Sequence, residues 1–171
     1  MEKFPVFSSK EEEKEYLESI SVAASKAMSL FRAGYNCSQS VFCAFADDLN
    51  LDKDIAAKIA SSFGGGMGRM REVCGAVSGM FLVAGYLLGY SDPKATTEKT
   101  EHYARIQFLA NEFKILNNSI VCKDLLGLNE KKFDNPQPEA RTESYYKKRP
   151  CEILVGHGAF IIESLLKKNN S

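Results

Sequence analysis

The sequence has 171 residues, enough for one domain with a single core, and it carries 22 basic and 22 acidic residues. With no net charge and no dense stripe of lysine and arginine, it is not expected to bind nucleic acid. The N-terminus lacks the basic, apolar and small-residue order of a signal peptide, which favours a cytoplasmic protein. Its five cysteines are therefore expected to be metal ligands, redox thiols or buried packing residues rather than structural disulfides, in a single domain over residues 1–171.

Two helices are predicted before residue 50. Ser9 and Glu12 have the spacing of a capping box before an amphipathic helix, which Gly34 would end with a left-handed conformation. The apolar side of this helix holds Leu17, Ile20, Ala24, Ala27 and Phe31. Asn36 can cap a second helix that begins at Cys37. The buried side of the second helix is expected to hold Val41, Phe42, Phe45 and Leu49.

A central helix is predicted in the middle of the sequence. Before it, Asp52 can start a third helix that the glycine-dense stretch 64–68 would end. The inward side of this third helix is expected to hold Ile55, Ile59 and Phe63. Residues 73–90 carry no charge and are about long enough to cross a bilayer, but they contain several glycines, and no second span exists. We therefore expect a central apolar helix over about 72–90 and no membrane span.

A long bundle helix and a short helical turn are predicted next. Asp92 followed by Pro93 is a strong start signal, because proline at the first helical position loses no hydrogen bond. The apolar seam of the long helix would contain His102, Ile106, Leu109, Phe113 and Leu116. Ser119 can then cap a turn that contains Cys122 and closes at Gly127.

The end of the sequence is read as a surface loop followed by a last helix. Residues 128–140 are polar and contain two prolines, so they predict a loop, and the last helix begins near Pro150. No segment shows the alternation of a strand or an internal repeat. The fold class is therefore all-α, a compact bundle of about five to seven helices around the central apolar helix.

Four of the five cysteines share a position in or just before the first turn of a predicted helix, namely Cys37, Cys74, Cys122 and Cys151. Unpaired N–H groups and the positive end of the helix dipole stabilise a thiolate there and lower its pKa. Four converging thiolates could ligate an iron-sulfur cluster, and Gly66 and Gly75 would bring backbone close to it. Cys43 falls on another side of its helix and is not a candidate ligand.

Three other uses of the same cysteines remain open. Zinc would take the same ligands, since sequence does not separate it from iron. Without metal, pairs of these cysteines would cycle between dithiol and disulfide with a partner reductase. Free cysteines also pack in cores, so a helical interaction module with structural cysteines is a third alternative. No two cysteines form a CxxC pair, and there is no CxxCH, so covalent c-type haem is not expected.

Neighbouring polar residues carry weaker signals. Arg69 and Arg71 could offset negative charge near Cys74, although loop arginines are more often solvated. His157 is expected to be a hydrogen-bonded core histidine rather than a site residue. The glycines of 64–68 follow no predicted strand and precede no Walker lysine, so a nucleotide site is not expected.

Four stretches of the sequence carry a resemblance to a known family: NCSQSVF, GGGMGRMREVCGAVSG, CKDLLG and RPCEILV. In this order, from about Ala33 to Val155, they resemble the redox-active proteins named for their C_GCAxxG_C_C cysteine pattern. The resemblance implies four characteristic cysteines, a compact helical fold and a redox role. The family is also distantly similar to the cluster-bearing part of split-Soret cytochrome c, which implies a cluster without haems. Electron transfer would then need a redox partner protein, and a homo-oligomer is compatible with the sequence.

Overall fold

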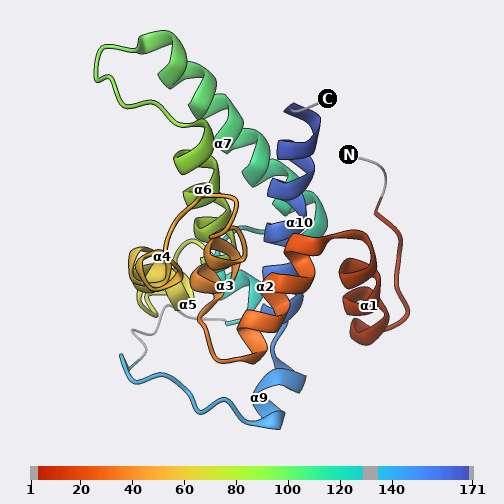
Figure 1. Cartoon of the computed structure of the whole chain (residues 1–171). Helices are drawn as coiled ribbons and strands as arrows, with labels where there is room; N and C mark the ends of the chain where they lie inside the picture. Colours follow the sequence, from red (N-terminus) through yellow and green to blue (C-terminus); the bar gives the residue numbers. More distant parts are fainter. Residues whose placement is uncertain (1–3, 129–134, 170–171) are drawn as a thin grey trace.

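The computed structural model describes residues 4–128 and 135–169, and the all-α prediction is confirmed for them. The only extended pairing in these ranges is an isolated antiparallel bridge between Val73 and Val121. The helices, shown in Figure 1, are α1 (Lys10–Ile20), α2 (Val22–Arg32), α3 (Cys37–Ala44), α4 (Lys53–Ala60), the 3-10 helix η1 (Ser61–Phe63), α5 (Gly64–Met67), α6 (Gly75–Leu88), α7 (Thr96–Asn117), α8 (Cys122–Leu125), α9 (Glu143–Lys148) and α10 (Cys151–Asn169).

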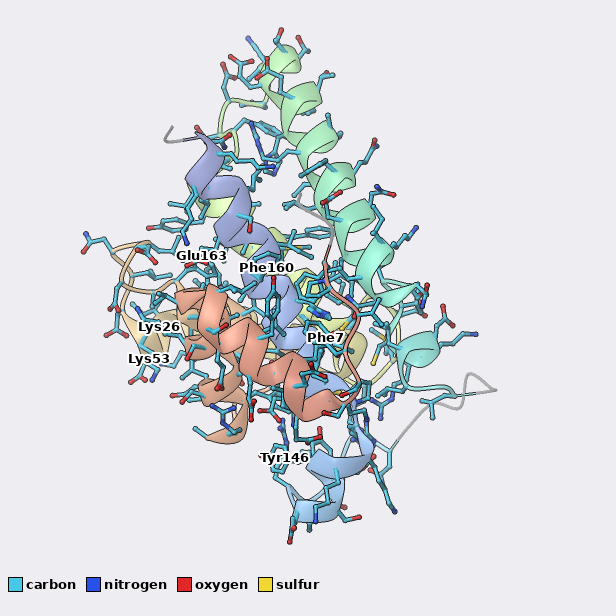
Figure 2. All side chains as sticks on the ribbon, turned by 90° about the vertical axis from the view of Figure 1, so that its right-hand side faces the viewer. Phe7, Lys26, Lys53, Tyr146, Phe160 and Glu163 are labelled. Atoms are coloured by element: carbon cyan, nitrogen blue, oxygen red, sulfur yellow. The ribbon has the colours of Figure 1, made fainter. Side chains whose placement is uncertain are left out.

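Two helices, α6 and α10, form the centre of the bundle. The predicted apolar helix is α6, which starts at Gly75 because Cys74 is its N-cap, and it packs against α3, α7 and α10. The last helix, α10, contacts α1, α2, α3, α6 and α7, and in Figure 2 it runs between α1 and α7. Its first nine residues, 151–159, are all buried. The centre of the bundle is therefore formed by both α6 and α10. No described helix is both long and apolar enough for a membrane span.

The first predicted helix is two helices that meet at Ser21. The backbone of Ser21 is extended, with φ −140° and ψ 116°. Its N–H donates to the Leu17 carbonyl, and its side chain accepts from the Ala24 N–H, so one residue ends α1 and caps α2. At the start of α1, Ser9 is the predicted N-cap, and its side chain accepts from the Glu12 N–H. The Glu12 carboxylate accepts from Ser8 rather than from the Ser9 N–H, so only half of the predicted capping box forms.

The next two helices were predicted at the right starts but with errors in their extent or their buried side. Asn36 and Gln39 form a reciprocal capping box at the start of α3, yet α3 ends at Ala44, and the buried Phe45 and Leu49 lie in the turns that follow. Asp52 caps α4 as expected. The side of α4 that packs inward holds Ala56 and Ala60, whereas Ile55 and Ile59 are 49% and 45% exposed. The predicted inward face of this helix was therefore wrong, because close packing against α3 selects the small residues.

The second half differs from prediction at three points. The Asp92 carboxylate accepts from the Lys94 N–H in a turn, and α7 begins only at Thr96. Within the predicted seam of α7, Leu109 and Phe113 are fully buried, and His102, Ile106 and Leu116 are half-buried. His102 and Ile106 lie toward the α6–α7 end, which projects from the body (Figure 1). The helix α9 was not predicted.

The short helical turn was predicted correctly, and the following loop was predicted in part. Ser119 holds α8 by accepting from the Val121 N–H and donating to Asp124, and Gly127 closes it with φ +65°. Of the predicted loop 128–140, residues 129–134 lie outside the described part of the chain, and 135–140 contain no helix.

Candidate functional site

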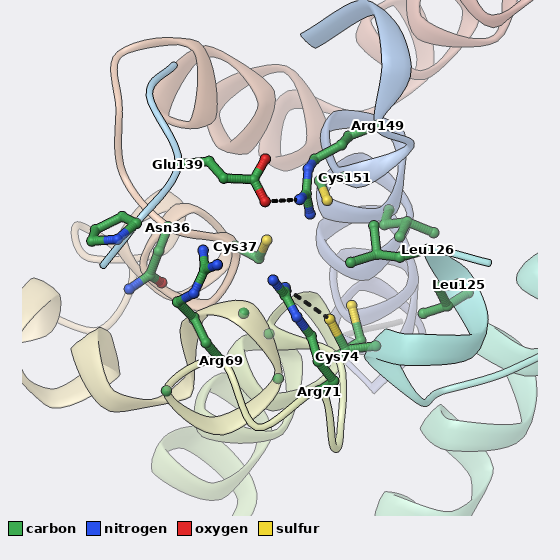
Figure 3. Close-up of a pocket in the computed structure, with 18 of the residues that line it drawn as sticks. Asn36, Cys37, Arg69, Arg71, Cys74, Leu125, Leu126, Glu139, Arg149 and Cys151 are labelled. Atoms are coloured by element: carbon green, nitrogen blue, oxygen red, sulfur yellow. Dashed lines mark hydrogen bonds and ion pairs between the residues drawn. The ribbon is translucent and has the colours of Figure 1, made fainter. Parts of the chain in front are cut away.

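The structure brings the four cysteines at helix starts to one cavity of about 240 Å³, shown in Figure 3. Cys37 is the first residue of α3, Cys74 is the N-cap of α6, and Cys122 and Cys151 are the first residues of α8 and α10. All four are free thiols. Cys74, Cys122 and Cys151 are buried, and Cys37 is half-buried. Four segments that are far apart in the sequence thus contribute a cysteine to the same cavity.

Backbone pairing joins the segments that carry Cys74 and Cys122. The Cys74 N–H donates to the Ile120 carbonyl at 2.8 Å, and the Cys122 N–H donates to the Glu72 carbonyl at 2.6 Å. These bonds flank the isolated bridge between the two segments. The two thiols are therefore held by main-chain hydrogen bonds rather than by side-chain packing alone.

The two glycines predicted to approach a cofactor lie directly against cysteines. A Cβ on Gly75 would lie 2.9 Å from the Cys37 Cβ, and a Cβ on Gly66 would lie 2.6 Å from the Cys122 Cβ. Both glycines line the cavity, and Gly66 has φ +72°. They set how closely the cysteine-bearing segments approach one another, and backbone contact to a cofactor stays a prediction.

The glycine-rich bend continues into residues with a left-handed backbone. Met67, Arg69 and Arg71 have φ of +64°, +70° and +62°, a conformation that costs side-chain-bearing residues free energy and clusters at functional sites. Arg71 is only 4% exposed, and its Nη1 lies 4.0 Å from the Cys122 Sγ. Arg69 and Arg71 both line the cavity, so Arg71 is not the solvated loop residue that its position suggested.

One wall of the cavity comes from the segment 136–149, which the sequence did not connect with the site. Its lining residues include Arg141, Tyr145 and Arg149. Arg149 forms an ion pair with Glu139 at the rim, seen in Figure 3. Only Arg149, two residues before a candidate cysteine, had a local signal that could have indicated this role.

Cys37 and Cys151 form a hydrogen-bonded pair of unequal acidity. The hydrogen bond that the Cys37 thiol donates to Cys151, helped by the charges of two nearby arginines, lowers the Cys151 pKa to about 7 although burial opposes it. The same hydrogen bond and burial raise the Cys37 pKa well above its ordinary value. At neutral pH Cys37 is therefore a protonated thiol, and it lies next to Cys151, which is partly ionised.

The other two thiols are protonated at neutral pH. Burial raises the Cys74 pKa to about 12, despite backbone hydrogen bonds from the first turn of α6. Burial also raises the Cys122 pKa, and Arg71 opposes this shift. The prediction that helix starts lower the pKa of all four thiols was thus wrong for three of them. The hydrogen bond to Cys151 is the main cause for Cys37, and desolvation is the main cause for Cys74 and Cys122.

The fifth cysteine and the buried histidine lie elsewhere. Cys43 is buried against the Lys53 carbonyl, 3.9 Å from its sulfur, and burial raises its pKa. His157 is a core residue, with Nδ1 2.9 Å from Asn117 Oδ1 and Nε2 3.1 Å from Glu13 Oε1. Neither residue lines the cysteine cavity.

The four cavity cysteines do not form a ready-made site for one metal ion in the described part of the chain. Four thiolates around zinc at about 2.3 Å would lie about 3.8 Å apart. Within residues 4–128 and 135–169, no three His, Cys, Asp or Glu side chains are grouped closely enough to hold a single ion.

A comparison with family models assigns the chain to a family. The model described as "Putative redox-active protein (C_GCAxxG_C_C)" matches residues 35–165, which include all four cavity cysteines. The chain belongs to this family. The family pattern GCAxxG begins with glycine followed by cysteine, whereas this C_GCAxxG_C_C protein has the reverse order, Cys74 followed by Gly75. Ala76 and Gly79 then occupy the alanine and the final glycine of the pattern. The comparisons with curated proteins and with solved structures gave no match, and the similarity to split-Soret cytochrome c stays a prediction.

Proposed function

We propose that this C_GCAxxG_C_C protein transfers electrons through an iron-sulfur cluster ligated by the four cavity cysteines. The observation that carries the proposal is that the four thiols line one cavity of about 240 Å³. Protein interiors are close-packed, and cysteines that only pack a core leave no such space between them. A cofactor between the sulfurs would occupy it.

Charge and hydrogen-bond donors in the cavity wall support the same proposal. A cluster with four thiolate ligands has a net negative charge, and Arg69, Arg71, Arg141 and Arg149 line the cavity. The starts of α3, α6 and α10 also open onto it, and their backbone N–H groups are suited to sulfur atoms. The wall therefore offers compensation for the charge that four ionised thiols would bring.

Each group of residues would have a distinct task. A bound cluster would supply reversible one-electron chemistry. Cys151 enters ligation most readily because its pKa is already about 7, whereas Cys74 must lose a proton that burial holds. Arg71, close to Cys122, favours the thiolate form of that ligand. The segment 136–149 would form one wall around the bound cluster.

Anaerobic reconstitution of the purified chain with ferrous iron and sulfide tests this function. After desalting, we expect both elements to remain bound and a visible absorption band that bleaches when dithionite is added. Protein that retains neither iron nor sulfide would contradict the proposal. Iron retained without sulfide, in a single-ion site, would also contradict it.

Thiol–disulfide exchange is a second candidate, favoured by the hydrogen bond between Cys37 and Cys151. The Cys151 thiolate would attack a partner disulfide and release one partner thiolate, which takes up a proton. Cys37 would then lose its proton and attack the mixed disulfide, so that the Cys37–Cys151 disulfide forms and the partner leaves as a dithiol. Peptide mapping after exposure to oxidised glutathione should identify this disulfide. Its absence would remove the second candidate.

A further inference from the structure

Positively charged side chains line the cavity that holds the four cysteines. Four guanidinium groups line it, from Arg69, Arg71, Arg141 and Arg149. Glu139 is the one carboxylate among the lining residues that the structure describes, and it is paired with Arg149 at the rim. Arginine is the side chain best suited to bind planar or tetrahedral oxyanions through several N–H groups.

One N–H group of Arg141 has no hydrogen-bond acceptor among the described residues. Its guanidinium stacks on the Phe31 ring at 4.5 Å and on the Tyr145 ring at 4.9 Å, and its Nη2 donates to the Tyr35 carbonyl at 3.3 Å. Nη1 is buried and has no hydrogen-bond partner in the described residues. A buried donor without an acceptor costs free energy, so the position favours an acceptor that enters the cavity.

The glycine-rich bend and three helix starts also line the cavity. Gly65, Gly66 and Gly68 line the cavity with φ of +66°, +72° and +61°, so this part of the wall is backbone without side chains. Three helices of eight residues or more, α3, α6 and α10, begin at the cavity with the positive end of the helix dipole. Guanidinium groups, peptide N–H groups and helix dipoles thus act on the same space.

We propose that the arginine-lined side of the cavity binds a small inorganic oxyanion of the sulfate or phosphate class, with Arg141 Nη1 as one of its donors. This inference rests on the proposed function only in making the oxyanion an effector of the same redox site. Binding itself requires no cluster. The cavity volume of about 240 Å³ is far larger than the space of about 15 Å³ that one water needs.

Calorimetric titration of the reduced, metal-free full chain with sodium sulfate and sodium phosphate tests the proposal. We expect saturable one-to-one binding of at least one of these anions, and no saturable binding of chloride at equal ionic strength. Arg141→Gln should weaken binding about tenfold or more, because it removes a charged hydrogen-bond donor. Arg105→Gln is the matched control, since Arg105 donates to the Leu88 carbonyl and does not line the cavity.

A second readout keeps the proposal testable if Arg141→Gln does not fold. In the wild-type chain, the bound oxyanion should slow the modification of Cys151 by iodoacetamide, and chloride should not. Absence of saturable binding, an equal loss in Arg105→Gln, unchanged binding in a folded Arg141→Gln, or no protection of Cys151 would each overturn the inference.

The two proposals fail separately. A chain that binds iron and sulfide but no oxyanion would refute the oxyanion site and leave the cluster in place. A chain that binds the oxyanion but neither iron nor sulfide would refute the cluster and leave the anion site in place.

Discussion

Gly75→Ala is the substitution that most directly tests how the cysteine-bearing helices are spaced. The added Cβ would lie 2.9 Å from the Cys37 Cβ, 3.0 Å from the Phe63 carbonyl oxygen and 3.1 Å from the Ser38 backbone nitrogen. Optimal contact between carbon atoms is about 3.5–4.0 Å, so α3 and α6 must move apart by roughly half an ångström. Two of the three obstructing atoms belong to backbone and cannot rotate away.

The expected loss follows from overpacking. Inserting a methyl group into a tight interface costs about 1–3 kcal/mol, which lowers the midpoint of thermal unfolding by roughly 2–12 °C for a domain of this size. Gly85→Ala, later in the same helix, is the matched control because nothing lies within 4 Å of its Cβ. It should raise stability by about 0.5–1 kcal/mol, as alanine does in place of glycine inside a helix.

Thermal unfolding followed by circular dichroism measures both variants. Iron bound per chain after anaerobic reconstitution should also fall in Gly75→Ala, because Cys37 is displaced relative to Cys74, and should be unchanged in Gly85→Ala. If Gly75→Ala unfolds at the wild-type temperature or above, the close contact between these helices does not have the role inferred for it.

Two other perturbations test the electrostatics around the site. In reduced, metal-free protein, the rate of Cys151 modification by iodoacetamide should rise with pH around a midpoint near 7, because its lowered pKa makes it a thiolate above that pH. The pKa of Cys74 is about 12, so its modification should stay slow up to pH 9, the ordinary pKa of a cysteine thiol. Equal midpoints for the two thiols would contradict these pKa shifts. Glu152→Gln should cost about 1–3 kcal/mol in urea unfolding, because the buried Glu152 carboxylate lies 3.0 Å from Lys14 Nζ and 2.7 Å from Arg32 Nη1. A loss within experimental error would show that the two basic groups are satisfied by solvent.

Helix starts could be predicted because their signals are local. Asn36 and Asp52 cap helices through hydrogen bonds to backbone N–H groups within three residues, and such pairs can be recognised in any sequence. Local signals also explain why the positions of the four cavity cysteines could be predicted, because each is the first residue or the N-cap of a helix. The break at Ser21 was missed because the apolar spacing of one helix continues across it.

The inward face of α4 and the full wall of the site depend on tertiary contacts. Both the isoleucine and the alanine face of α4 are apolar at helical spacing, and only packing against α3 selects Ala56 and Ala60. Arg141 reaches the cavity because its guanidinium stacks on Phe31, 110 positions earlier in the numbering, and no local pattern records that contact. The raised pKa of Cys74 has the same origin, since burial is a property of the folded chain.

A cysteine scan of cluster content tests the central claim most directly. Each of the five cysteines is replaced by alanine, and iron and sulfide are measured after anaerobic reconstitution of the folded chains. We predict that Cys43→Ala retains the wild-type content, because Cys43 lies outside the cavity, and that replacing any of the four cavity cysteines lowers it. Wild-type protein without iron and sulfide, or a loss in Cys43→Ala equal to that in the four cavity variants, would contradict the account.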